Sequence, residues 1–118
     1  MSNVKIYHNP RCSKSRQALQ IIKDHGIEPK VIEYLKEPLK KSELENIAKT
    51  LGVRPKEFVR KNEAEFKDNN IAGKLEKDSD LFEAILNFPK IMERPIITSD
   101  LGAVIGRPPE NVLKILEI

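Results

Sequence analysis

The chain has 118 residues, 39% of them hydrophobic and 33% charged, which is the size and composition of one globular domain with its own core. No apolar stretch is long enough to span a membrane and Met1 leads directly into the first predicted strand, so we expect no signal peptide and a cytoplasmic protein. The net charge of +3 is small and acidic and basic residues alternate, which argues against nucleic-acid binding.

The first 35 residues predict a strand, a helix and a second strand. The first strand is Val4–Tyr7, apolar residues at helical spacing follow it, and Gly26 is placed to end the helix. The second strand is Lys30–Leu35, between prolines. This order is typical of a parallel crossover unit.

The middle of the chain is predicted to be helical. Ser42 and Glu45 fit a capping box at the start of a helix that ends at Gly52. Pro55 can open a further short helix, and residues 61–77 are polar and irregular, with one helical turn near Ala64–Lys67.

The last third predicts one helix, a hairpin and a final helix. Asp78 or Ser79 would cap a helix that Pro89 ends. Two short apolar strands, Pro95–Thr98 and Ala103–Ile105, are separated by a turn and form the hairpin. The final helix opens at two prolines, and the residues expected to face inward are Val112, Leu113 and Leu116.

These elements together predict an α/β fold. We expect a four-stranded mixed sheet with helices on both faces, which is the thioredoxin-like arrangement. The prediction is a single thioredoxin-like domain over residues 1–118 with a helical insertion at about 42–90.

Cys12 is the only cysteine, and it lies on the predicted turn between the first strand and the first helix. The free N–H groups and the dipole of a helix N-terminus favour a thiolate and can bind an oxyanion. A lone cysteine is more often a small buried hydrophobe, but its neighbours Arg11, Lys14 and Arg16 are not a core composition. We therefore predict a reactive thiol that is mostly ionised at neutral pH, and its oxidation would need an external thiol.

Arg60, Arg94 and Arg107 each lie beside a break in the predicted secondary structure. The planar guanidinium matches a tetrahedral oxyanion, although a single arginine is more often a solvated surface charge. Arg94 has the best case, because Pro95 at the start of a strand suggests a cis peptide bond beside the Cys12 turn.

His8 and Ser15 flank Cys12. A protonated His8 would help to hold a thiolate, or it could be a strand-end histidine without a chemical role. Ser15 could donate a hydrogen bond to the thiolate or only support the start of the helix. The sequence has no cluster with zinc-ligand spacing and no phosphate-binding glycine loop, so we expect no metal and no bound cofactor.

The segment His8-Asn9-Pro10-x-Cys12-x-x-Ser15-Arg16 resembles the active-site motif of the glutaredoxin-linked arsenate reductases, in their short, thioredoxin-like form. Further blocks resemble that family in the same order, so the likeness covers essentially the whole chain. These blocks are Tyr34-Leu35, Leu39–Leu44, Arg60-Lys61-Asn62, Arg94-Pro95-Ile96 and Gly106-Arg107-Pro108.

The resemblance implies the reduction of arsenate to arsenite, with glutathione as co-substrate and glutaredoxin as partner. It also implies that Cys12 is the nucleophile, that Arg60, Arg94 and Arg107 bind the oxyanion, and that His8 tunes the thiol. We expect a monomer that binds neither nucleic acid nor membranes. Two alternatives are an Spx-like regulator that binds RNA polymerase, which Ser15 in place of a second cysteine weakens, and a glutathione-dependent reductase of another substrate.

Overall fold

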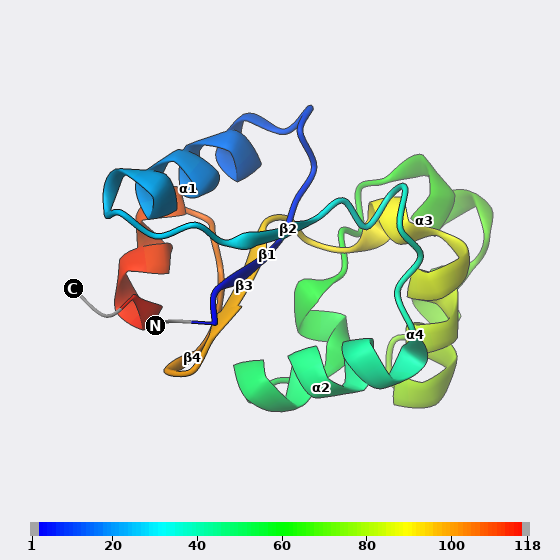
Figure 1. Cartoon of the computed structure of the whole chain (residues 1–118). Helices are drawn as coiled ribbons and strands as arrows, with labels where there is room; N and C mark the ends of the chain where they lie inside the picture. The colour runs from blue at the N-terminus through cyan, green and yellow to red at the C-terminus, as the bar shows by residue number, and fades with distance from the viewer. Residues whose placement is uncertain (1–2, 117–118) are drawn as a thin grey trace. The chain divides into compact units, whose positions relative to one another are not determined.

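The computed structural model describes residues 3–116, so the expectation drawn from Met1 lies outside it. The chain forms two compact units, one of Met1–Glu37 with Arg94–Ile118 and the other of Pro38–Glu93 (Figure 1). The first unit contains β1 (Lys5–Tyr7), α1 (Ser13–Asp24), β2 (Lys30–Ile32), β3 (Ile96–Ser99), β4 (Gly102–Ile105) and the 3₁₀ helix η4 (Pro109–Ile115).

The first unit is built on a four-stranded mixed sheet with the order β2-β1-β3-β4, and the predicted α/β fold class is confirmed. β1 pairs in parallel with β2, which the predicted crossover unit requires, and antiparallel with β3. β3 and β4 form the predicted hairpin, with Asp100 and Leu101 in its turn. The second strand is shorter than predicted, because the backbone turns at Glu33, whose carbonyl accepts the N–H groups of Lys36 and Glu37.

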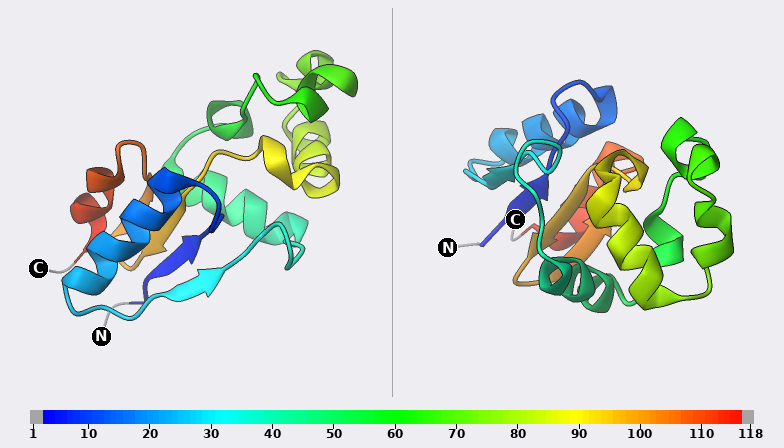
Figure 2. Two further views of the ribbon diagram at one scale, coloured as in Figure 1. Left: turned by 90° about the horizontal axis from the view of Figure 1, so that it is seen from above. Right: turned by 90° about the vertical axis from the view of Figure 1, so that its right-hand side faces the viewer.

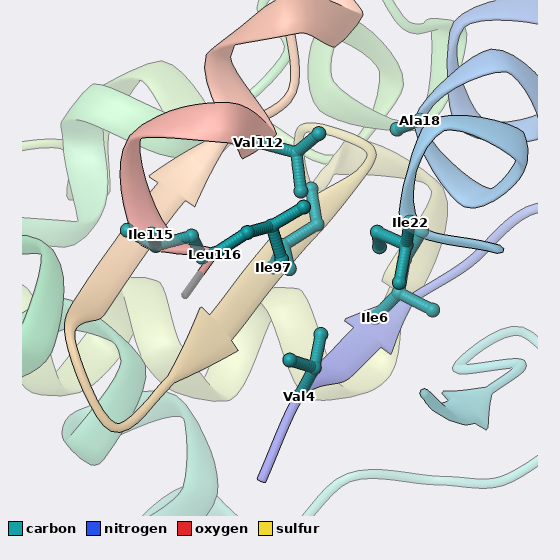
Figure 3. Close-up of a cluster of buried hydrophobic side chains, with 8 residues drawn as sticks. All are labelled: Val4, Ile6, Ala18, Ile22, Ile97, Val112, Ile115 and Leu116. Atoms are coloured by element: carbon teal, nitrogen blue, oxygen red, sulfur yellow. The ribbon is translucent and has the colours of Figure 1, made fainter. Parts of the chain in front are cut away.

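Both helical segments of this unit pack on one face of its sheet. α1 and η4 lie side by side, as the left view of Figure 2 shows. Their apolar side chains meet those of β1 and β3 in one cluster (Figure 3). The buried members of this core are Val4, Ile6, Ala18, Ile22, Ile97, Val112, Ile115 and Leu116.

The last helix differs from the prediction in its period. It is a 3₁₀ helix, so side chains three positions apart share a face, and Pro109, Val112 and Ile115 are the buried set. The prediction that Leu113 faces inward is wrong, because Leu113 is 37% exposed. Leu116, just after the helix, is buried as expected.

The second unit is helical and is arranged around α4. It contains α2 (Lys41–Leu51), η1 (Pro55–Phe58), α3 (Ala64–Asp68), η2 (Ile71–Lys74), α4 (Asp78–Asn87) and η3 (Pro89–Ile91). α4 packs against α2 and against η1, η2 and η3. The largest fully buried side chains here are Leu44, Ile47, Phe58, Ile71, Leu81, Ile85, Ile91 and Met92.

Two predicted helix starts in this unit are wrong by one or two residues. α2 is capped at Lys40 and not at Ser42, because the Glu43 carboxylate accepts the Lys40 N–H at 3.1 Å and fixes the first turn there. α4 is capped at Lys77, so Asp78 is its first residue. The negative charge of Asp78 is stabilised there by the positive end of the helix dipole. The predicted end of α2 at Gly52 is confirmed, with a left-handed φ of 73° that suits glycine.

Candidate active site

Cys12 is the residue that caps the N-terminus of α1, on the predicted turn, and its side chain is half-buried. The turn is fixed by its own backbone. The Cys12 N–H donates to the Asn9 carbonyl at 3.0 Å, and the Cys12 carbonyl accepts the Arg16 N–H at 3.0 Å. The Arg16 side chain donates back to the Pro10 carbonyl at 2.9 Å. The sulfur is therefore held at the positive end of a twelve-residue helix.

Several groups act on the ionisation of this thiol. Burial raises the pKa of Cys12, but the backbone N–H groups of Ser15 and Lys14, a hydrogen bond from Arg94 and the charge of Arg107 together outweigh it. The pKa of Cys12 is consequently lowered from its ordinary value, in the direction that the sequence predicted. A lowered pKa increases the thiolate fraction, which is the nucleophilic form.

Arg94 and Arg107 both reach Cys12. Arg107 Nη2 lies 3.5 Å from Cys12 Sγ, and Arg107 Nε donates to the Arg94 carbonyl at 2.8 Å. The peptide bond between Arg94 and Pro95 is cis, as predicted, and so is the bond between Arg107 and Pro108, which the sequence did not indicate. Two guanidinium groups beside a helix N-terminus form a site suited to an anion.

His8 and Ser15 contact each other. Ser15 Oγ lies 2.6 Å from His8 Nδ1 and accepts the Asn9 N–H at 3.1 Å. All three residues are buried, with Ser15 fully inaccessible. Burial and the charges of Arg16 and Lys23 lower the pKa of His8, against the opposing effect of Glu33.

A lowered pKa favours the neutral imidazole at neutral pH, and among the described residues the hydrogen-bond partner of the His8 ring is Ser15 and not Cys12. The Ser15 hydroxyl is directed to His8 and Asn9, so the side chain supports the start of the helix. It is the backbone N–H of Ser15, rather than its hydroxyl, that acts on the sulfur.

Arg60 belongs to the second unit, Pro38–Glu93. Its N–H donates to the Ile91 carbonyl at 2.6 Å, in a short pairing of residues 58–60 with residues 91–93. This pairing brings Arg60 Nε to 3.7 Å from a carboxylate oxygen of Glu63 and 3.7 Å from one of Glu93. Arg60 is thus an arginine held between two carboxylates.

Asn111 is a site residue that sequence reasoning missed. Its side-chain amide donates to the carbonyls of Ile105 and Arg107, both at 3.1 Å. An amide that binds only backbone carbonyls gives no compositional signal, although its position four residues after Arg107 could have drawn attention to it. Within residues 3–116, no group of three or more His, Cys, Asp or Glu is placed to hold a metal ion, and none of the helices there is long and apolar enough to cross a bilayer.

This chain is similar in sequence and in fold to known proteins. The solved structure of an arsenate reductase from Vibrio cholerae superposes with a TM-score of 0.91 at 41% identity, over 97% of this chain and 98% of that one. The arsenate reductase of Haemophilus influenzae is 40% identical, covering 97% of this chain and 99% of its own, and "Uncharacterized protein YfgD" of Escherichia coli is 45% identical over 96% of each. A model of the ArsC family matches residues 7–115, and this protein therefore belongs to the ArsC family.

Proposed function

We propose that this protein reduces arsenate to arsenite through a covalent adduct on Cys12, with glutathione and glutaredoxin as the source of electrons. The observation that carries the proposal is the convergence of Arg94, Arg107 and the α1 N-terminus on a thiol whose pKa they lower. Relatives named arsenate reductase at about 40% identity support the choice of arsenate.

In the proposed reaction, the oxyanion is held by Arg94, Arg107 and the amides of the Cys12 turn. The Cys12 thiolate attacks arsenic(V), a sulfur–arsenic bond forms, and water leaves after protonation of one arsenate oxygen. A glutathione thiolate then attacks Cys12 Sγ. The electron pair of the breaking sulfur–arsenic bond stays on arsenic, which becomes arsenic(III), and the two sulfurs are joined in a mixed disulfide.

Glutaredoxin then resolves the mixed disulfide by thiol exchange and regenerates the Cys12 thiolate. The sequence supports this last step, because Cys12 is the only cysteine and an internal disulfide cannot form. Arg60 remains a predicted oxyanion ligand on the basis of the family resemblance, and Arg60→Ala tests that role.

The test is a coupled assay with arsenate, glutathione, glutaredoxin, glutathione reductase and NADPH, in which arsenate-dependent NADPH oxidation is measured. We expect turnover by the wild type and none by Cys12→Ser, because a hydroxyl cannot form the mixed disulfide. The control is Ser13→Ala, which alters an exposed side chain on α1 and should retain turnover. Turnover by folded Cys12→Ser, or none by the wild type, would refute the proposal.

A glutathione-dependent reductase of another substrate is the second candidate. YfgD, whose name states no substrate, is more similar to this chain at 45% identity than the Haemophilus influenzae arsenate reductase at 40%. The same assay with other oxyanions and small disulfides in place of arsenate distinguishes the two candidates. Higher kcat/KM on one of these substrates would favour the second.

A further inference from the structure

We propose that Asn111 is a positioning residue of the active site, which acts by holding the turn that directs Arg107 at Cys12. The inference rests on the proposed function for its significance, but the contacts that carry it lie entirely within the unit that contains the sheet. Neither the family match nor the names of the relatives assign a role to this asparagine.

The first observation is that Asn111 ties the two ends of the turn together. Its Nδ2 donates to the Ile105 carbonyl at the end of β4 and to the Arg107 carbonyl two residues later, both at 3.1 Å. The Asn111 backbone N–H donates to the Pro108 carbonyl at 3.0 Å. Asn111 therefore binds three backbone carbonyls within a four-residue stretch, those of residues 105, 107 and 108, and Arg107 itself is one of these residues.

The second observation is that the rest of the turn is packed with little room to move. The Gly106 N–H donates to the Pro95 carbonyl at 2.8 Å. A β-carbon at Gly106 would lie 2.7 Å from Pro95 Cγ and 3.1 Å from Ile97 Cδ1, so the turn lies directly on β3 and its preceding residue. The turn is thus fixed on the sheet side by Gly106 and on the helix side by Asn111.

The third observation is what this turn carries. The Arg107 side chain spans from the Arg94 carbonyl, which accepts its Nε–H at 2.8 Å, to Cys12 Sγ at 3.5 Å from Nη2. A long arginine side chain loses its geometry when its backbone moves, and small displacements of a positioned group reduce its effect strongly. Loss of the Asn111 amide should therefore weaken the effect of Arg107 without removing its charge.

The test is a double-mutant cycle read out on the thiol. The alkylation rate of Cys12 is measured against pH for the wild type, Asn111→Ala, Arg107→Ala and the double variant, which is unambiguous because the chain has one cysteine. We expect the midpoint to move to higher pH in Arg107→Ala and, by a smaller amount, in Asn111→Ala. In the double variant the midpoint should equal that of Arg107→Ala alone.

Asn69→Ala is the matched control, because Asn69 Nδ2 also donates to a backbone carbonyl, that of Glu65 at 2.8 Å, but in the other unit. It should leave the midpoint unchanged. If Asn111→Ala is not folded at the assay temperature, Asn111→Ser decides the test, because its hydroxyl can satisfy one of the two carbonyls and should give an intermediate shift. A wild-type midpoint in the folded Asn111 variant, or shifts that add in the double variant, would overturn the proposal.

Binding of arsenate, measured by its protection of Cys12 from alkylation, separates this inference from the proposed function. We expect the arsenate concentration for half protection to rise about tenfold or more in Arg107→Ala and a few-fold in Asn111→Ala. Shifted thiol midpoints without arsenate protection would refute arsenate as substrate and leave the role of Asn111 standing. Arsenate turnover by the wild type together with an unshifted thiol midpoint in Asn111→Ala would support arsenate as the substrate and refute the role of Asn111.

Discussion

Ser15→Ala tests the buried hydrogen bonds under the Cys12 turn. The substitution removes one oxygen, which lies 2.6 Å from His8 Nδ1 and accepts the Asn9 N–H at 3.1 Å. Ser15 is fully buried, His8 is 5% exposed and Asn9 is 8% exposed, so water cannot readily replace the lost partner. Two buried polar groups would be left without that partner.

The expected cost follows from these two groups. A buried group that loses its hydrogen-bond partner costs about 1–3 kcal/mol. The better helix propensity of alanine offsets about 0.5 kcal/mol of this. We therefore expect the free energy of unfolding to fall by about 1.5–5.5 kcal/mol for the two groups together, which lowers the Tm by on the order of 10 °C for a chain of this length.

The assay is thermal unfolding of Ser15→Ala beside Ser13→Ala, which alters an exposed serine on the same helix and should change stability by less than about 0.5 kcal/mol. The Cys12 alkylation midpoint is measured on both. It should stay at the wild-type pH, because Ser15 acts on the sulfur through its backbone N–H, which alanine retains. Equal Tm values for the two variants would refute the buried network, and a raised midpoint in Ser15→Ala would mean that the hydroxyl donates to the thiolate.

Two further predictions concern burial and packing. The pKa of His8 is lowered by burial, so the unfolded chain binds its proton more readily, and stability should be full above about pH 6.5 and decline as the pH falls below it. His8→Gln should flatten this decline, whereas the control His25→Gln, at an exposed position, should leave it unchanged. The measurement is the free energy of unfolding of both variants between pH 5 and 8. Gly106→Ala should lower the free energy of unfolding by about 1–3 kcal/mol, because the new β-carbon would lie 2.7 Å from Pro95 Cγ. The control is Gly73→Ala, where the new β-carbon would have nothing within 4 Å and should not have this cost. Equal urea midpoints for the two variants would contradict the close packing at Gly106.

Local patterns in the sequence predicted the order of the elements, and the parts that were wrong depend on information that such patterns lack. β1, α1, β2 and the hairpin were predicted because apolar spacing and turn residues are local. Leu113 was assigned to the core from an α-helical period, whereas the helix that begins at Pro109 is a 3₁₀ helix and buries Ile115 instead. Ser42 is a better cap by residue type than Lys40, but the Glu43 carboxylate fixes the helix start.

The candidate site likewise contains residues that local patterns predicted and residues that they did not. The position of Cys12 at a helix N-terminus was predictable, because it depends on residues within one turn of it. The approach of Arg107 was expected only from the family resemblance and not from local patterns, because it joins residues 95 positions apart and depends on the placement of β1 beside β3 and of β4 beyond it. Asn111 was missed because its partners are backbone carbonyls, which every residue possesses, so that only its spacing from Arg107 could have indicated it.

The first turn of α1 has no acidic residue, although carboxylates there would stabilise the helix dipole, and it carries Lys14 and Arg16 instead. The helix thus gives up about 0.3–1 kcal/mol that one acidic residue in that turn would contribute. The same positive charge favours an ionised Cys12. Stability and reactivity consequently place opposite demands on this turn, so selection of variants for heat resistance alone would enrich Lys14→Glu while moving the thiol back toward ordinary acidity.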